Sequence, residues 1–149
     1  MDEYRSPTQL LADAAAINVS MTTFLARCEV AGLIDFEAQQ LHRSLASIGR
    51  CAETAMALLA HHRRNLHGHR TAGAKDVAND CASTQGVSPS AVQRAIGVVE
   101  KLGQLSEIDA AARRGELSTR ELELIAGAAA HNPTQQQRLL DAKAGGLTA

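Results

Sequence analysis

Hydrophobic residues recur along this chain at the spacing of α-helices. Between Asp35 and about Asn65 the apolar positions step by four, three, four, three and four residues, an average near 3.5, which is typical of a seam against another helix. No segment alternates apolar and polar residues as a half-buried strand does. The pattern therefore predicts an all-α protein. The apolar positions of the long helix are Leu41, Leu45, Ile48, Ala52, Ala55 and Leu59.

Capping and helix-breaking residues place the predicted helix boundaries. Ser6-Pro7 predicts the start of a first helix over 7–17, and residues 18–20 predict a break before a second helix that ends near Gly32. Asp35 is expected to cap the long helix. The later helices are predicted at 74–82, 88–101, 106–113, 118–129 and 133–140. Ser118 and Glu121 are expected to form a capping box at the start of the helix over 118–129. We therefore expect a helical arm over 1–66 and a second helical domain over 67–149.

The segment 74–101 predicts a helix, a glycine turn over 83–87 and a second helix. Gly86 tolerates the left-handed backbone that such a turn needs. Ser88 followed by Pro89 is typical of a helix start. This order of elements is how helix-turn-helix proteins bring side chains to the base edges of DNA, although it also fits an ordinary corner of an all-α domain. The residues expected to pack the two helices together are Val77, Cys81, Ala82, Val87, Val92 and Ile96.

Charge supports a nucleic-acid site in the same part of the chain. The whole chain has a net charge of −1, but residues 61–101 hold six Arg/Lys against three Asp/Glu. A local excess of positive charge is the electrostatic footprint of a phosphate-binding surface. The residues predicted to contact bases are Ser88, Ser90, Gln93 and Arg94. Those predicted to contact phosphates are Arg63, Arg64, His67, His69, Arg70, Lys75 and Lys101.

Composition favours a non-catalytic protein of a reducing compartment. The three cysteines, Cys28, Cys51 and Cys81, form no CxxC pair and are expected to be small buried residues of a cytoplasmic protein. We expect no secretory leader, and the sequence has no apolar run long enough to cross a membrane. His67 and His69 lack the spacing of zinc ligands, and no phosphate-binding glycine loop is present. We expect no catalytic residue, metal, cofactor or small-molecule substrate.

The seam of the long helix has two interpretations. It can pack against the first helices of the same chain, or it can join two copies of the chain into a homodimer. The residues predicted for self-association are Leu41, Leu45, Ile48, Ala52 and Leu59.

Several short motifs lie between Gly68 and Leu140. They are Gly68-His69-Arg70-Thr71-Ala72, Gly86-Val87-Ser88, Leu102 with Leu105, Arg114-Gly115-Glu116-Leu117-Ser118, and Leu124-Ile125-Ala126. In this order the motifs resemble an actinobacterial family of unknown function, the mycobacterial thirteen-E-twelve repeat proteins and their phage relatives. Two positions depart from that family's pattern, since Val77 stands where Trp is common and Ser106 where Pro is common.

In that family the helical region commonly precedes an HNH endonuclease domain. The resemblance therefore implies a DNA-directed helical domain of phage or mobile-element type. The domain that it implies lacks the catalytic part. Because the tail over 144–149 has no helix-stop signal, we also expect that the chain is a truncated form of something longer. The stretch from Gly86 to Ala126 is also similar to the helix-turn-helix region of ParB-type partition proteins, which again implies binding to DNA.

The sequence therefore predicts a protein that binds double-stranded DNA through a helix-turn-helix. Two alternatives remain open. One is a helical protein-interaction module that works through the long-helix seam. The other is the N-terminal regulatory half of an HNH endonuclease whose catalytic domain lies outside this chain.

Overall fold

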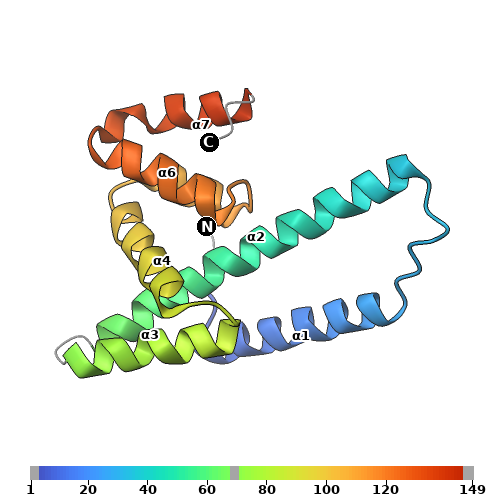
Figure 1. Ribbon diagram of the computed structural model, residues 1–149, viewed down its shortest axis with the longest axis horizontal. Coiled ribbons are helices and arrows are strands. Elements are labelled where there is room, and N and C mark those ends of the chain that lie inside the picture. Colours follow the sequence, from blue (N-terminus) through green and yellow to red (C-terminus); the bar gives the residue numbers. More distant parts are fainter. Residues whose placement is uncertain (1–3, 68–70, 146–149) are drawn as a thin grey trace. The chain divides into compact units, whose positions relative to one another are not determined.

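The computed structural model describes residues 4–67 and 71–145, with the side chains of 71–75 left out. All regular structure in these ranges is helical, as the apolar pattern predicts (Figure 1). The chain divides into two compact units, Met1–Leu41 and His42–Ala149, which are described separately. The elements are α1 (Pro7–Ala26), α2 (Asp35–Leu66), α3 (Thr71–Gln85), α4 (Pro89–Leu102), α5 (Ser106–Arg113), α6 (Thr119–Ala130), the 3-10 helix η1 (Pro133–Gln135) and α7 (Gln136–Ala144).

Helix α1 is continuous where the sequence predicts a break. It begins with a capping box, in which the Ser6 hydroxyl accepts from the Gln9 amide and the Gln9 side chain accepts from the Ser6 amide. Residues 18–20 disfavour a helix only weakly, and no glycine or proline occurs between residues 8 and 31 to stop it. The helix ends at Ala26 with Arg27 as its C-cap. Both the predicted break and the predicted end near Gly32 are therefore wrong.

The long helix α2 confirms its predicted extent, but its start differs in detail. Asp35 lies inside the first turn. The N-terminus of α2 is capped by Glu37, whose carboxylate accepts a hydrogen bond from the Ile34 amide at 3.1 Å. The predicted capping role of Asp35 is therefore wrong, although its negative charge still stabilises the helix N-terminus.

The second unit, His42–Ala149, has two hydrophobic clusters. The first joins α2, α3 and α4 through Ala60, Val77, Ala78, Cys81, Ala82, Val92 and Ile96. The second joins α4, α5 and α6 through Val98, Leu102, Leu105, Ile108, Ala111, Ala112, Leu117, Leu122, Ile125, Ala126 and Ala129, with Leu139 and Leu140 of α7 against it. Helix α4 contributes to both clusters, so its buried face is fixed from two sides.

The sequence predicts most of the first cluster. Val77, Cys81, Ala82, Val92 and Ile96 are buried together as expected. Val87 is not, because the turn leaves its side chain 45% exposed. Of the other two cysteines, Cys28 is half-buried and Cys51 is exposed, so burial of all three is a wrong prediction.

Alanine fills much of the interior of this unit. Ala111, Ala112, Ala126 and Ala129 have no solvent exposure, and Ala60 is 1% exposed. A methyl side chain lets neighbouring helix backbones come close together. The chain has two Phe, one Tyr and no Trp, so close helix packing replaces large aromatic side chains in this core.

Local signals in the last third of the chain are largely confirmed. Helix α5 has its predicted bounds and Gly115 follows it with φ of 72°. Ser118 forms the predicted capping box with Glu121 at the start of α6. The helix predicted from residue 133 instead begins as η1 and continues as α7.

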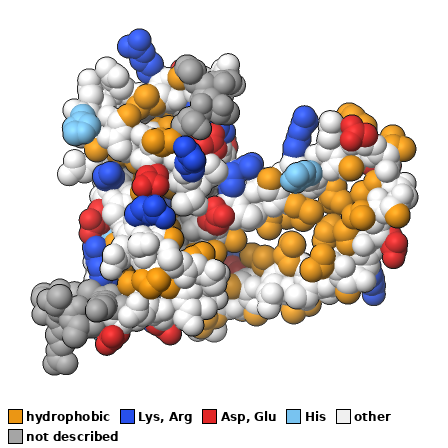
Figure 2. Space-filling model, in the orientation of Figure 1, with side chains coloured by type: hydrophobic (Ala, Val, Ile, Leu, Met, Phe, Trp, Pro, Cys, Tyr) orange, Lys and Arg blue, Asp and Glu red, His pale blue; other side chains and the backbone are white. Residues whose placement is uncertain are grey.

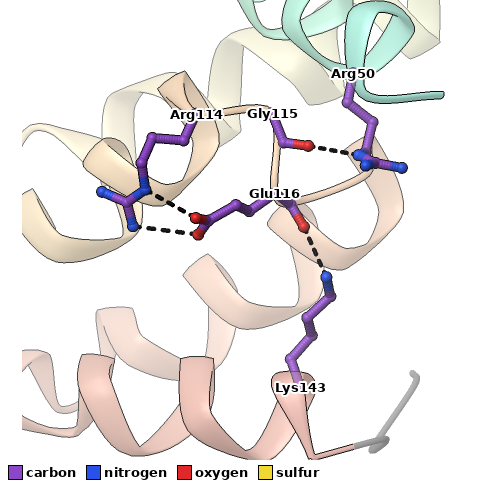
Figure 3. Close-up of polar contacts among 5 residues, drawn as sticks. All are labelled: Arg50, Arg114, Gly115, Glu116 and Lys143. Atoms are coloured by element: carbon purple, nitrogen blue, oxygen red, sulfur yellow. Dashed lines mark hydrogen bonds and ion pairs between the residues drawn. The ribbon is translucent and has the colours of Figure 1, made fainter. Parts of the chain in front are cut away.

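Gly115 lies in a close contact between the α5–α6 connection and α2 (Figure 3). Arg50 donates from Nε to the Gly115 carbonyl at 2.6 Å, and Lys143 donates to the neighbouring Glu116 carbonyl at 2.7 Å. A Cβ added at Gly115 would lie 3.0 Å from the Ser47 carbonyl oxygen and 2.6 Å from Cys51 Sγ. A side chain is therefore opposed both by the backbone conformation and by the surface of α2.

Arg114 and Glu116 form a two-pronged ion pair beside this contact. The Arg114 guanidinium donates to the two carboxylate oxygens at 2.9 Å and 3.2 Å. These hydrogen bonds hold the pKa of Glu116 below its usual value. Both side chains are exposed, so the pair adds little to stability.

Gln136 of α7 caps the N-terminus of α5 from a distance in sequence. Leu105, at the N-cap, has no side chain that can do so. The buried Gln136 side chain accepts from the amides of Glu107 and Ile108 at 3.0 Å and 3.2 Å, and its own amide donates to the Pro133 carbonyl at 2.9 Å. The side-chain oxygen of Gln136 therefore joins α7 to α5, and its nitrogen joins α7 to η1.

Replacing Gly115 with Ala is expected to lower the free energy of unfolding by about 1–3 kcal/mol, since the new Cβ meets a left-handed φ and the α2 backbone. Urea denaturation of the purified variant measures this. Gly127→Ala is the matched control, because Gly127 lies in α6 with only Lys101 Nζ at 4.0 Å. It should leave stability unchanged or raise it. A loss for the control equal to that for Gly115→Ala would contradict the argument.

Gln136→Ala is expected to lower the free energy of unfolding by about 1–3 kcal/mol, because two amides of α5 lose their buried acceptor. Thermal or urea unfolding measures the change. Gln137→Ala serves as control, since the exposed Gln137 only donates to Asp141 on its own helix. Equal stability of the Gln136 and Gln137 variants would show that water replaces the cap.

Candidate nucleic-acid interface

The turn between α3 and α4 is tighter than the sequence predicts. Helix α3 continues to Gln85, so only Gly86, Val87 and Ser88 connect the two helices. Gly86 has φ of 73°, and the amides of Gly86 and Val87 both donate to the Ala82 carbonyl, at 2.8 Å and 3.0 Å. These bonds satisfy the end of α3 as a glycine C-cap does. The predicted turn over 83–87 is therefore too long at its start.

Ser88 is occupied in capping α4. Its hydroxyl accepts from the Ala91 amide at 3.2 Å and lies 3.1 Å from the Ser90 hydroxyl. Pro89 follows at the first helical position. The predicted helix start is confirmed, and contact with a base through Ser88 would compete with the cap.

Helix α4 has one buried and one exposed face. Val92, Ile96, Val98 and Leu102 are buried. Ser90, Gln93 and Arg94 are exposed on its first two turns, and Lys101 is exposed near its end. The three predicted base-contacting residues other than Ser88 therefore share the exposed edge of one helix.

Arg63 and Arg64 are paired with carboxylates. Arg63 donates to Asp80 of α3 at 2.7 Å, and its pKa is raised first by this hydrogen bond and then by the nearby Cys81. Arg64 forms an ion pair with Glu100 of α4. Two ion pairs thus join the C-terminal end of α2 to α3 and α4. These contacts use two of the six cationic side chains of residues 61–101 in ion pairs with carboxylates of the same segment.

The other predicted phosphate contacts are placed only in part. His67 is exposed just after α2. His69 and Arg70 lie outside the described residues, as does the side chain of Lys75. On the face shown in Figure 2, cationic and anionic side chains are interspersed over α4–α7. A continuous basic surface is not seen on that face.

A groove of about 300 Å³ runs beside α4, between α2 and α6. Its floor is apolar and includes Met56, Val92 and Leu122, while Arg94 and the carboxylates of Glu53 and Glu123 also line it. The Thr119 hydroxyl donates to Glu53 at 2.5 Å. The groove has the composition of a binding site for an apolar side chain rather than for phosphate.

The residues predicted for self-association share one helix, α2. Leu41 and Leu45 are half-buried, whereas Ile48, Ala52 and Leu59 are exposed.

In the described ranges, 4–67 and 71–145, no three His, Cys, Asp or Glu side chains are grouped so as to hold a metal ion. No helix of the same ranges is long and apolar enough to cross a membrane.

The sequence indicates neither the groove nor the partners of the two arginine ion pairs. Asp80 and Glu100 lie 17 and 36 residues from the arginines they bind, and no local pattern indicates such pairs. The groove likewise collects residues from α2, α4 and α6. The groove and the ion pairs could be predicted only if it were already known which helices pack together.

No protein-family model, curated protein or solved structure matches this chain. The resemblances to the thirteen-E-twelve repeat family and to ParB-type proteins therefore remain predictions.

Ser88→Ala is expected to lower the free energy of unfolding by about 1 kcal/mol through loss of the α4 cap. Ser90→Ala is the control, because the Ser90 hydroxyl contacts only the Ser88 hydroxyl and is exposed. Chemical denaturation compares the two variants. If Ser90→Ala costs as much as Ser88→Ala, the stability assigned to the cap is wrong.

Proposed function

We propose that the protein binds double-stranded DNA through the exposed edge of α4, as a non-catalytic helix-turn-helix protein. The observation that carries the proposal is the division of α4 into a fixed apolar face and a polar edge formed by Ser90, Gln93 and Arg94. A recognition helix needs this arrangement, because its N-terminal side chains must reach base edges while the helix stays anchored.

The chemistry of the edge fits the major groove. Arg94 makes no ion pair with the described residues, so its guanidinium can donate to the two acceptors of guanine. Gln93 carries an amide that can pair with adenine. Arg94 is therefore the first candidate for base contact.

Phosphate contacts are proposed for fewer residues than the sequence suggests. Arg63 and Arg64 support the framework through Asp80 and Glu100, which leaves His67 and Lys101 as described candidates, together with His69, Arg70 and Lys75. Glu53 and Glu123 would repel phosphates placed over the groove. Arg94 also lines the groove, so the duplex is expected to approach α4 from its first turns without covering Glu53 and Glu123.

A helical protein-interaction module is the second candidate function. The observation that favours it is the apolar groove beside α4, of about 300 Å³. Such a module would bind a partner's apolar side chain between α2, α4 and α6. The resemblance to the region ahead of HNH domains also supports a third role, as the regulatory half of a longer nuclease.

The test is selection of bound duplexes from a random pool at fixed salt, followed by titration of Arg94→Ala on the preferred and on a random duplex. The loss is expected to be about 1–3 kcal/mol, roughly five- to 150-fold, on the preferred duplex and small on the random one. Arg138→Ala is the control, since Arg138 is exposed on α7 away from α4.

Two results would count against the proposal. An equal loss on both duplexes would contradict base contact by Arg94. Absence of any duplex binding by the wild-type chain would overturn DNA binding and favour the interaction module.

A further inference from the structure

The groove beside α4 lies wholly within the second unit, between α2, α4 and α6. It is lined by Ala57, Ala91 and Ala95, which are half-buried, and by Val92 and Leu122, which are buried. The small alanine side chains leave a hollow of about 300 Å³, which is at the lower end of the size range of ligand pockets. The groove therefore has room for one large apolar side chain.

Met56 gives the groove an adaptable lining. This residue of α2 is half-buried, and its unbranched thioether side chain can fit differently shaped neighbours. Methionine is common for this reason at surfaces that bind partner helices. Met56 also offers a signal by which occupation of the groove can be observed.

The rim of the groove carries two carboxylates. Glu53 of α2 accepts a hydrogen bond from the Thr119 hydroxyl at 2.5 Å, and Glu123 lies one turn further along α6. In residues 4–67 and 71–145, neither carboxylate forms an ion pair with Arg94, the cation that also lines the groove. The part of the rim formed by α2 and α6 is therefore negative, and charge complementarity favours an occupant that carries a cation.

The exposure of these carboxylates favours a protein partner over a small ligand. Glu53 and Glu123 are exposed, so a cation meets them at the surface rather than inside the hollow. Small-molecule sites enclose most of the ligand, whereas protein interfaces combine an apolar centre with a polar rim. A helix carries an apolar residue and a basic residue one turn apart on the same face, which fits an apolar hollow with a charged rim.

The first unit of the same chain has the wrong charge for this rim. Residues 1–41 contain two Arg and no Lys against six Asp or Glu. Helix α1 carries Asp13 as its only charged residue. Negative charge brought to a rim of carboxylates disfavours binding, so a basic segment of another protein fits the groove better.

We infer that the groove binds a basic helical segment of a partner protein. The segment inserts one large apolar side chain between α2, α4 and α6 and places a Lys or Arg beside Glu53 and Glu123. The inference rests on the second candidate function, the interaction module, and names the chemistry of its partner. It does not depend on DNA binding.

The probe is an alanine-based helical peptide, selected with the full chain from a displayed library that varies a central residue and its neighbours one turn away. The selection is expected to enrich large apolar residues at the centre and Lys or Arg beside them. Binding is followed by NMR of methyl-labelled methionine, because the chain has only Met1, Met21 and Met56. The Met56 signal, assigned by its loss in Met56→Leu, is expected to shift on addition of the peptide, while the Met21 signal stays unchanged.

Charge changes in the peptide and in the rim test the role of the carboxylates. The same peptide with Glu in place of its basic residue is expected to bind roughly tenfold more weakly. Glu53→Gln with Glu123→Gln is expected to abolish this difference, because glutamine keeps an acceptor for the Thr119 hydroxyl but has no charge. Asp76→Asn with Asp141→Asn is the matched control and should keep the difference, since both residues are exposed and neither lines the groove.

The possible failures can be told apart. No enriched peptide, or no shift of the Met56 signal, would overturn both this inference and the interaction module. A Met56 shift with equal affinity for the basic and acidic peptides would keep the module but overturn its basic partner, as would loss of the difference in the control variant.

Two further results would replace the partner protein with another occupant and so overturn the inference. A Met21 shift as large as that of Met56 would indicate that the peptide displaces residues 1–41. A Met56 signal that moves with protein concentration alone would indicate a second copy of the chain. Duplex titration of the same samples tests DNA binding separately.

Discussion

The burial of α4 in two hydrophobic clusters is the constraint on which the second unit depends. Val92 and Ile96 hold its first half against α2 and α3, while Val98 and Leu102 hold its second half against α5 and α6. A helix fixed at both ends cannot rotate about its axis without exposing one of these pairs. The direction in which Gln93 and Arg94 point is therefore a consequence of core packing.

Polar contacts add specificity to this framework. The ion pairs from Arg63 and Arg64 connect the end of α2 to α3 and α4. Gln136 joins α7 to α5. The hydrogen bond from Arg50 to the Gly115 carbonyl joins α2 to the segment between α5 and α6. Exposed ion pairs contribute little energy, whereas the buried Gln136 amide leaves two unsatisfied donors if it is lost. The same framework thus combines strong and weak contacts, and the strong ones involve backbone groups.

Features set by neighbouring residues could be predicted from the sequence. The extent of α2, the bounds of α5, the Ser118 capping box and the left-handed Gly86 all depend on residues a few positions apart, and all are confirmed. The sequence wrongly predicts a break in α1, because weak helix formers do not stop a helix on their own. It does not predict the ion pairs of Arg63 and Arg64, because their partners are distant in sequence. For the candidate site, the exposed edge of α4 follows from helical periodicity, whereas the groove beside it does not.

The alanine-rich interior changes how this protein responds to mutation. In a core of leucine and phenylalanine, truncation to alanine opens cavities and reveals which residues matter. Here several of the most enclosed positions are already alanine, so an alanine scan would pass over them without effect. Enlargement is the informative change, because an added methylene at such a position has to push two helix backbones apart. Tolerance in this chain is thus governed by how close its helices lie, and substitutions to valine or leucine would map that closeness.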